Sequence, residues 1–539
     1  TLSVSSAASD VYKRQMMANN SEFGNGAYTV MSMMLAEELD VDYRSIALEA
    51  APTTPEYYSP LFREYLTAGS VTTGSTFIPM RTAGAKARAM LLDAASRAWQ
   101  VPLAELTTRD GAVLHEASGR RNPYGDLLEA ISRFAIQPPE TVALRDPSEF
   151  KILGKPAKRY EGPGKVDGSA EFGIDIKLPG MLYGAIARPP VHGGSVVDFD
   201  ASEALAMPGV VKAKAIRAGV VVLADSYWRA QKARDKLKIT WDRGANAGVS
   251  SEQFYSDYRA LAETPGMLAE DIGDALGTLS AADDVVEATY EMPLLAHATL
   301  EPMNCIAQIE GDSCTIWSGT QYQSNDQEVI SRFLGIPQQN VTIHRPLMGG
   351  SFGRRSSKTA DYTVEAVEAA MGESVPVQII WSREEDIRSG HYRPLFVHKL
   401  RGSVDGSGMP QAWHQVAVGQ SLMQGTKHDP TYMVRGMDIY SLDGCLQEPF
   451  GVFPYGTSYQ IPHHRVESHN APRSGIVPQE WRSVGHTHTG IAYECFLDEL
   501  AHKGGIDPLE LRLRLTKDHP RMNRVLSVLK EKCGWDTPL

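Results

Sequence analysis

A short glycine-rich stretch carries the residue types best suited to holding a ligand. Residues 348–355 read Met-Gly-Gly-Ser-Phe-Gly-Arg-Arg, between a strand-like segment at 341–346 and a helix-like run at 359–371. Glycines let backbone N–H groups approach a ligand closely, and arginines supply fixed positive charge for a phosphate or another oxyanion. The stretch lacks the Gly-Lys-Ser/Thr ending of a P-loop and the Gly-x-Gly-x-x-Gly spacing of a dinucleotide fold. From these residues alone, a tight turn with positive φ explains it equally well.

Two further stretches have the composition of an anion-binding helix start. Residues 22–26 (Glu-Phe-Gly-Asn-Gly) precede a helix predicted at 29–39, and a simple cap is the favoured interpretation there. Residues 68–76 are rich in glycine and hydroxyl groups, and they lead through Pro79 into a helix predicted at 83–99. Their hydroxyls are able to donate to a phosphate or a nucleobase edge, but a loop that caps the helix is an equal alternative.

Other polar residues give weaker signals. His297 and Glu301 have the four-residue spacing of two metal ligands on a helix, but no third ligand is spaced nearby and Pro302 disfavours a helix, so structural roles are favoured. Arg482 precedes a helix whose inward residues we expect to be Ile491, Cys495, Phe496 and Leu500. An arginine buried at such a position needs an anion, whereas an exposed one needs only a surface partner.

Composition limits the classes of function. The 539 residues are 42% apolar and 22% charged, which is ordinary for a globular protein, and no uninterrupted apolar run approaches the roughly 20 residues that span a bilayer. A net charge of -12 argues against a nucleic-acid surface and fits small molecules or protein partners. The five cysteines are never spaced Cys-x-x-Cys, so we expect no zinc site or iron–sulfur cluster on this chain.

The elements that must position these residues fall into several units of an α+β chain. Residues 1–15 are polar and aperiodic, and we expect a non-native or disordered leader. A first unit at 16–137 mixes helices with a hairpin, and a second at 150–243 is built of short strands with Asp-Gly and Pro-Gly turns. Residues 246–277 are interpreted as a polar connector, and the third unit, at 278–539, contains the glycine-rich stretch.

Several spaced motifs together resemble the xanthine oxidase family of molybdenum hydroxylases, in its isoquinoline 1-oxidoreductase beta-subunit branch. Residues 349–355 are similar to the family's Gly-Gly-x-Phe-Gly loop. Flanking motifs occur in the expected order, at 381–387, 392–394, 481–486 and 496–502. The resemblance runs from about Asn19 to Leu539. It implies an α/β hammerhead domain at 150–243 and mixed α/β molybdopterin-binding domains at 16–137, in permuted order, and at 278–539.

The resemblance also implies roles for individual residues. Phe352 and Gly353 would pack against the oxo side of the metal, Gln321 would hydrogen-bond that oxo group, and Arg482 would face the cofactor across the pocket. No protein side chain would bind the metal, because the pterin dithiolene holds it. The pterin and its dinucleotide tail would be held by Phe23, Gly24, Asn25, Gly26, Thr72, Thr73, Ser75, Gly349, Gly350, Phe352, Gly353 and Arg482.

The function implied by the resemblance is the hydroxylation of an isoquinoline-like N-heteroaromatic or an aldehyde with oxygen from water. The cofactor would be molybdenum-molybdopterin cytosine dinucleotide, and electrons would pass to a small partner subunit that holds two [2Fe-2S] clusters, with cytochrome c as a further acceptor. By the same resemblance, Ser356 would stand in the substrate pocket at the position where purine-oxidising relatives place a glutamate, so purines are expected to be poor substrates.

The same resemblance leaves alternatives open. The family's general-base glutamate would lie beyond Leu539, so we expect a chain truncated at its C-terminus and inactive by itself. One alternative is an aldehyde or alcohol dehydrogenase large subunit coupled to a cytochrome. The other is a cofactor-binding fragment without catalysis.

Overall fold

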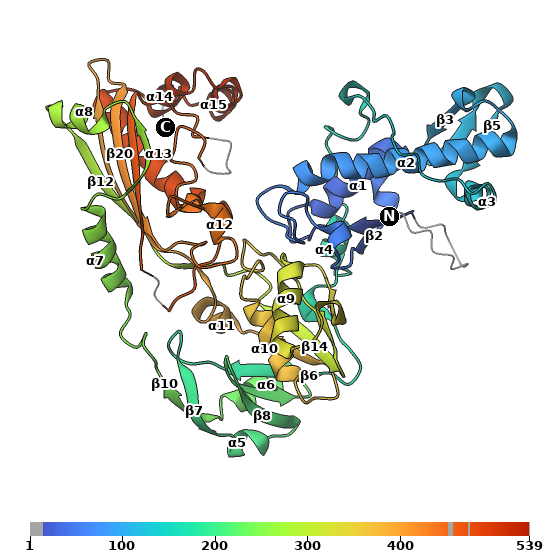
Figure 1. Cartoon of the computed structure of the whole chain (residues 1–539), viewed down its shortest axis with the longest axis horizontal. Coiled ribbons are helices and arrows are strands. Elements are labelled where there is room, and N and C mark those ends of the chain that lie inside the picture. Colours follow the sequence, from blue (N-terminus) through green and yellow to red (C-terminus); the bar gives the residue numbers. More distant parts are fainter. Residues whose placement is uncertain (1–13, 451–455, 473–474, 538–539) are drawn as a thin grey trace.

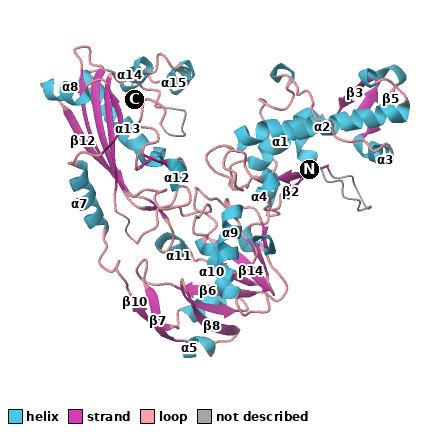
Figure 2. Ribbon diagram, in the orientation of Figure 1, coloured by secondary structure: helices cyan, strands magenta, loops and turns pink. Residues whose placement is uncertain are grey.

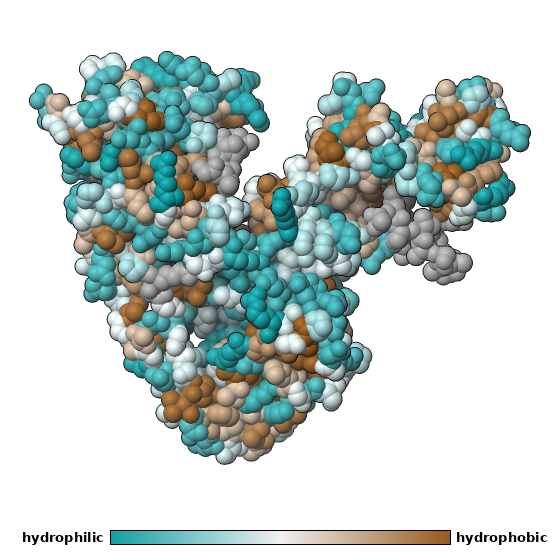
Figure 3. Space-filling model, viewed as in Figure 1, coloured by the Kyte–Doolittle hydropathy of each residue, from teal (hydrophilic) through white to brown (hydrophobic). Residues whose placement is uncertain are grey.

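The computed structural model describes residues 14–450, 456–472 and 475–537. Figure 1 shows three parts: an N-terminal part (mostly blue) at one side, a central part (green to yellow), and a part that contains the described C-terminal helices, in orange to red together with the green α7, α8 and β12. Helices and strands are mixed in each of them (Figure 2). Polar and apolar side chains are interspersed over the face drawn in Figure 3. Among the described helices, none is long and apolar enough to cross a membrane.

The N-terminal part is built on two long helices that pack against each other. Gly84 permits their close approach, because a β-carbon there would overlap the backbone oxygen of Leu35. The part comprises α1 (Ala27–Leu39), α2 (Thr72–Trp99), α3 (Leu128–Arg133), the parallel pair β1 (Arg14–Ala18) and β2 (Ile46–Ala50), and the antiparallel sheet of β3 (Leu106–Arg109), β4 (Ala112–His115) and β5 (Arg120–Pro123).

Two predictions for this part are wrong in their boundaries. Arg14 and Gln15 belong to β1 and pair with Ile46 and Ala47, so the expected leader extends two residues too far. The other 13 residues of that leader lie outside the described residues. The helix expected from residue 83 begins at Thr72 and contains Pro79. Proline removes one ladder hydrogen bond, which a 28-residue helix packed along α1 tolerates.

The central part is one seven-stranded sheet that joins strands from two of the expected units. Strand order is β16-β15-β14-β17-β6-β9-β8, and the parallel pair β17 and β6 connects the unit expected at 278–539 with the one expected at 150–243. The unit expected at 150–243 therefore shares its sheet with the third unit. The strands are β6 (Leu182–Ala187), β8 (Val210–Ile216), β9 (Gly219–Ala224), β14 (Asn304–Glu310), β15 (Ser313–Trp317), β16 (Val341–His344) and β17 (Val377–Ile380).

Both faces of this sheet are covered. Val221 and Leu223 of β9 pack with α10 (Asp361–Ala370) and α9 (Gln323–Leu334) in the main core, whereas Val222 and Ala224 pack towards α6 (Tyr227–Arg234) on the other face. This alternation is the period-two burial of a central strand, and it explains why β9 is apolar throughout.

The C-terminal part is a five-stranded sheet in the order β11-β23-β20-β19-β12, with α13 (His486–Gly504) on one face and α7 (Ser251–Ala262) on the other. Its strands are β11 (Met267–Ile272), β12 (Val286–Met292), β19 (Phe396–Val404), β20 (Pro410–Gly419) and β23 (His463–Asn470). The segment interpreted as a connector thus supplies both α7 and β11. In α13, Phe496 and Leu500 are buried as expected, but Ile491 and Cys495 are exposed because the inward stripe runs through neighbouring positions.

The remaining described elements are short or peripheral. They are α4 (Gly162–Asp167), α5 (Ser202–Leu205), α8 (Ala275–Ala281), α11 (Arg383–Arg388), α12 (Asp429–Tyr432), α14 (Pro508–Leu515), α15 (Pro520–Cys533), β7 (Ser195–Asp200), β10 (Lys238–Asp242), β13 (Leu295–Ala296), β18 (Tyr392–Arg393), β21 (Met433–Val434) and β22 (Met437–Asp438).

Candidate cofactor site

The glycine-rich loop connects β16 to α10 and takes a conformation that depends on its glycines. Gly350 and Gly353 have φ of 95° and 104°, and Phe352 also has a positive φ of 56°. A β-carbon on Gly353 would overlap the backbone oxygen of Glu480, and one on Gly349 would overlap the side chain of Glu301. The glycines are therefore required first by close packing within the protein.

The two arginines of the loop are buried and neutralised inside the protein. Arg355 donates to the Glu301 carboxylate at 2.9 Å and to the Gly319 carbonyl at 3.1 Å. Arg354 pairs with Asp361, with one donor-to-oxygen distance of 3.1 Å. A buried guanidinium needs such partners, so the prediction that these arginines offer charge to a ligand is wrong.

Gln321 ties the loop to the N-terminal part. Its side-chain amide donates to the Thr67 carbonyl at 2.6 Å, and its amide oxygen accepts from the Ser351 hydroxyl. Its backbone N–H donates to the Arg355 carbonyl, and its own carbonyl accepts from the Thr67 N–H, both at 2.9 Å. The side chain is buried. Gln321 thus lies where three segments distant in sequence meet.

The segment at 22–26 holds its own anion. The Glu22 carboxylate accepts from the N–H groups of Gly24 at 2.7 Å and Gly26 at 3.4 Å, and Lys165 lies 3.4 Å away. The Asn25 side chain accepts from the Ala27 N–H at 3.3 Å, just before the first turn of α1. Because Glu22 fills the cradle, an external anion is not needed there, while Phe23, Gly24 and Asn25 remain at least partly exposed.

The start of α2 lies beside this segment. Ser21 donates to the Thr320 carbonyl at 2.9 Å, and Thr72 donates to the Asn20 side chain at 3.0 Å. Of the three predicted donors, Ser75 bonds back to the Thr72 carbonyl at 3.4 Å and Thr73 is exposed. No side chain caps the helix, whose first N–H groups are therefore open to an anion such as a phosphate.

Residues 479–482 close the other side of the loop. The Arg482 N–H donates to the Phe352 carbonyl at 2.8 Å, and the Gln479 side chain donates to the Gly353 carbonyl at 3.1 Å. Trp481 stacks on the Phe352 ring with centroids 6.2 Å apart, and the Arg482 guanidinium lies 5.8 Å from that ring. Arg482 is exposed, so of the two alternatives left by the sequence the buried one is wrong, and the cation–π contact needs no burial.

Three further polar residues, Ser356, His297 and Glu301, make hydrogen bonds within the loop or to the backbone packed against it. The Ser356 hydroxyl donates to the Gly353 carbonyl at 2.6 Å and is buried, so it offers nothing to a pocket in this arrangement. Burial lowers the pKa of His297 to about 3, so its neutral ring donates to the Glu480 carbonyl at 2.8 Å. Glu301 accepts from the Gly349 N–H at 2.7 Å. Among the described residues, no cluster of His, Cys, Asp and Glu is able to hold a metal ion.

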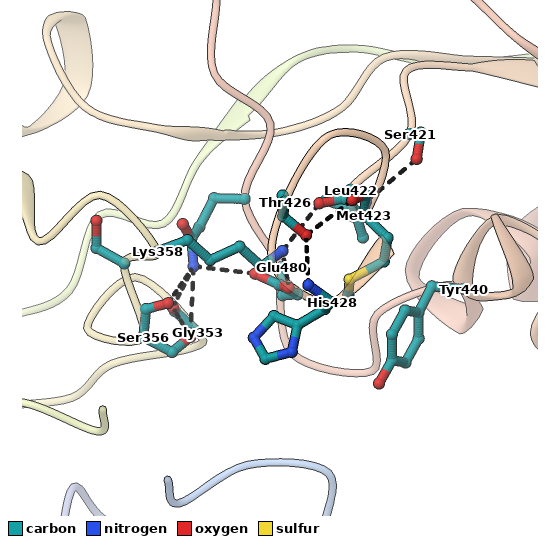
Figure 4. A network of polar contacts seen from close by, with 12 residues as sticks. Gly353, Ser356, Lys358, Ser421, Leu422, Met423, Thr426, His428, Tyr440 and Glu480 are labelled. Atoms are coloured by element: carbon teal, nitrogen blue, oxygen red, sulfur yellow. Dashed lines mark hydrogen bonds and ion pairs between the residues drawn. The ribbon is translucent and has the colours of Figure 1, made fainter. Parts of the chain in front are cut away.

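Sequence reasoning missed a group of titratable residues around the loop. Asp326 is buried and accepts from the hydroxyls of Thr320 and Thr363; burial raises its pKa to about 7, against those two hydrogen bonds, which lower it. Lys358 lies 2.5 Å from the Glu480 carboxylate, and His428 lies nearby (Figure 4). No local pattern marks these residues, because their partners come from other segments.

The site therefore offers backbone donors, aromatic rings and one exposed guanidinium, and the described residues contain no cluster of His, Cys, Asp and Glu side chains able to hold a metal ion. This set suits an organic cofactor with phosphates and its own reactive centre.

Comparisons with known proteins agree with this reading. Two models described as "Molybdopterin cofactor-binding domain" match residues 14–174 and 261–515. The isoquinoline 1-oxidoreductase subunit beta of Brevundimonas diminuta is 28% identical over 95% of this chain and 70% of its own length. The membrane-bound aldehyde dehydrogenase of Gluconacetobacter polyoxogenes is 28% identical over 92% of this chain, which spans 64% of that relative.

Solved structures share the fold. Quinoline 2-oxidoreductase from Pseudomonas putida 86 aligns with a TM-score of 0.53 and 18% identity, over 74% of this chain and 56% of that one. Aldehyde oxidoreductase from Desulfovibrio gigas aligns with a TM-score of 0.50 and 19% identity, over 72% of this chain and 46% of that one. The predicted mixed, multi-domain fold class is thereby confirmed.

Proposed function

Because this chain belongs to the molybdopterin-binding subunits of the xanthine oxidase family, we propose that it is the catalytic subunit of a molybdenum hydroxylase that oxidises an N-heteroaromatic compound or an aldehyde with oxygen from water. One observation carries this proposal. The glycine-rich loop, the starts of α1 and α2, and residues 479–482 converge around Gln321, although up to 299 residues separate bonded partners.

The residues present fit the cofactor in two places. The uncapped start of α2, with Thr72, Thr73 and the exposed Gly74, suits the phosphates of a dinucleotide tail, which we propose to be that of the cytosine form. Phe352, Gly353 and Arg482 would border the metal end. The cofactor supplies the redox chemistry, and the chain positions it. Because Glu22 would repel a phosphate, residues 23–26 would contact the neutral edges of the pterin.

We assign the inner contacts to Gln321 and the loop. Gln321 would present its remaining amide N–H to the oxo group, while Thr67 and Ser351 hold the amide in place from two sides. The loop glycines 349, 350 and 353 would bring backbone close to the cofactor, and a β-carbon on Gly350 would find no atom nearer than 3.7 Å.

Electrons would leave through a partner. The described cysteines are free thiols, and Cys305, Cys314 and Cys445 are buried. This fits a chain that depends on another subunit for iron–sulfur clusters. We propose a small subunit with two [2Fe-2S] clusters. A cytochrome acceptor, with this chain as an aldehyde or alcohol dehydrogenase large subunit, is the second candidate, since the membrane-bound aldehyde dehydrogenase of Gluconacetobacter polyoxogenes is also 28% identical to this chain.

The substrate would be flat and neutral. Phe352, 37% exposed, and Trp481 form an apolar wall beside the site, and the Ser356 hydroxyl is engaged within the loop. A purine would find a serine in place of a glutamate at position 356, so its polar edge would be left with partners unmade, which should cost about 1 to 3 kcal/mol for each unsatisfied group.

One experiment tests the proposal and separates its alternatives. The full-length protein is purified together with its co-encoded small subunit, and molybdenum content is measured beside dye reduction with isoquinoline, benzaldehyde and xanthine. Bound molybdenum with turnover of isoquinoline or benzaldehyde would support it. Preferred oxidation of xanthine would contradict the substrate class, cytochrome reduction would favour the second candidate, and molybdenum without any turnover would leave only a cofactor-binding role.

A further inference from the structure

Tyr322, the residue after Gln321, lies in a row of three hydrogen-bonding side chains. Its hydroxyl donates to the carboxylate of Glu64, and His428 Nε2 lies 3.1 Å from the hydroxyl oxygen. The Tyr322 and His428 rings stack with centroids 6.2 Å apart. The three residues come from three distant segments, namely the loop before α2, the start of α9 and the start of α12.

The hydrogen bonds give this row a direction. Since the phenol proton points to Glu64, the phenol oxygen is left to accept, and the His428 Nε2–H is its donor. Burial raises the pKa of Tyr322, and its bond to Glu64 raises it further, so the phenol stays protonated. Burial lowers the pKa of His428, so its ring is neutral at pH 7 and Nδ1 is able to accept a proton.

The outer end of the row reaches the surface. The Glu64 carboxylate lies 2.5 Å from the ammonium group of Lys427, whose side chain is 38% exposed and also pairs with Glu328 at 3.4 Å. A proton on Glu64 therefore has direct access to solvent at that end.

The inner end borders the candidate site. The Glu480 carboxylate pairs with Lys358 at 2.5 Å, and Lys358 also donates to the Leu422 carbonyl at 2.9 Å (Figure 4). The backbone of the same Glu480 packs on Gly353. Negative charge on Glu64 and Glu480 raises the pKa of His428, and positive charge on Lys358 and Lys427 lowers it, so charged groups at both ends of the row act on His428. The Tyr432 ring packs against His428 with ring centroids 6.1 Å apart.

We propose that His428, Tyr322 and Glu64 form the route by which protons leave the site. This rests on the proposed function: conversion of C–H and water into C–OH releases two protons and two electrons, and the electrons go to the iron–sulfur partner. Each proton would bind His428 Nδ1 while the Nε2 proton passes to the Tyr322 oxygen and the phenol proton passes to Glu64. Glu64 then releases it to water, the proton left on Nδ1 shifts to Nε2 by tautomerisation, and the phenol O–H turns back towards Glu64, which restores the starting state.

The kinetic test uses the holoenzyme with its partner. Tyr322→Phe keeps the ring and its stack on His428 but removes the relay, so kcat should fall about tenfold to a hundredfold, with unchanged molybdenum content and a larger solvent isotope effect in D2O. The kcat of His428→Ala should fall by a similar factor, and added imidazole should restore part of it. Tyr432→Phe, beside His428 but outside the row, is the matched control and should keep the wild-type kcat and isotope effect.

A second readout does not depend on turnover. In protein labelled with 15N-histidine, with His428→Gln used to assign the signal, His428 should be in the Nε2–H tautomer above its pKa. An Nδ1–H tautomer would overturn the proposal, because Nε2 would have no proton to pass on. Wild-type rates in fully loaded Tyr322→Phe would overturn it as well and leave the proposed function intact, whereas a wild-type enzyme without any turnover would overturn both.

Discussion

The backbone carbonyl of Glu480 occupies the space that a side chain at Gly353 would need. Gly353 also has a φ of 104°, so two separate costs attach to any substitution there. The first is the strain of the conformation, of the order of 1 to 3 kcal/mol, and the second is the displacement of residues 479–482.

Gly353→Ala should therefore lower both the melting temperature and the molybdenum content. Gly372→Ala separates the two costs, because Gly372 has a φ of 79° but a β-carbon there meets no atom within 4 Å, and it has no assigned cofactor contact. We expect Gly372→Ala to show the strain alone and to keep more molybdenum. Equal molybdenum loss in the two variants would show that the overlap with Glu480 is unimportant.

Arg355→Met should destabilise the protein by about 3 to 5 kcal/mol, because it leaves the buried Glu301 carboxylate without its cation. Adding Glu301→Gln to Arg355→Met removes the unpaired charge and should recover part of the loss. Arg482→Ala is the surface comparison and should change the denaturation midpoint little while lowering molybdenum content. If the double variant were no more stable than Arg355→Met, the loss of stability would come from the contacts of Arg355 with backbone carbonyls.

Gly74→Asp should have opposite effects on stability and on cofactor binding. An acidic residue in the first turn stabilises a helix by about 0.3 to 1 kcal/mol, and replacing glycine adds to this. The same charge would repel a phosphate at the start of α2, so molybdenum content should fall. Gly74→Ala, which adds no charge, should raise the melting temperature and keep the cofactor. If Gly74→Asp retains full molybdenum content, the phosphates bind elsewhere.

Asp326 should make stability fall as pH rises. Its folded-state pKa of about 7 lies above the ordinary value for an aspartate, so the native state holds the extra proton between about pH 4 and 7. The stabilisation from that proton is complete below pH 4 and is lost as pH rises through 7. Asp326→Asn cannot ionise, so its denaturation midpoint, relative to the wild type, should increase from pH 5 to pH 8. A constant difference over this range would place the titration outside Asp326.

Local patterns in the sequence were sufficient for many elements. The helix predicted at 29–39, which spans Ala27–Leu39, and the hairpin at Asp110-Gly111 follow from apolar periodicity and turn residues that lie within a few positions of one another. The spaced motifs were sufficient for the family. In each case the deciding interactions are between near neighbours, or the residue types are demanded by the backbone itself.

The partners of the site residues were decided only by the tertiary structure. Arg355 reads as a ligand-binding charge until Glu301, 54 residues away, is placed against it. Gln321 and Thr67 are 254 residues apart, and the three residues of the proposed proton route come from three segments. Glu22 was adjacent to its cradle in sequence, yet whether its carboxylate turned inward depended on how α1 was packed. Burial is a property of the whole chain, and it is burial that determines which charges must be paired internally and which remain for a ligand.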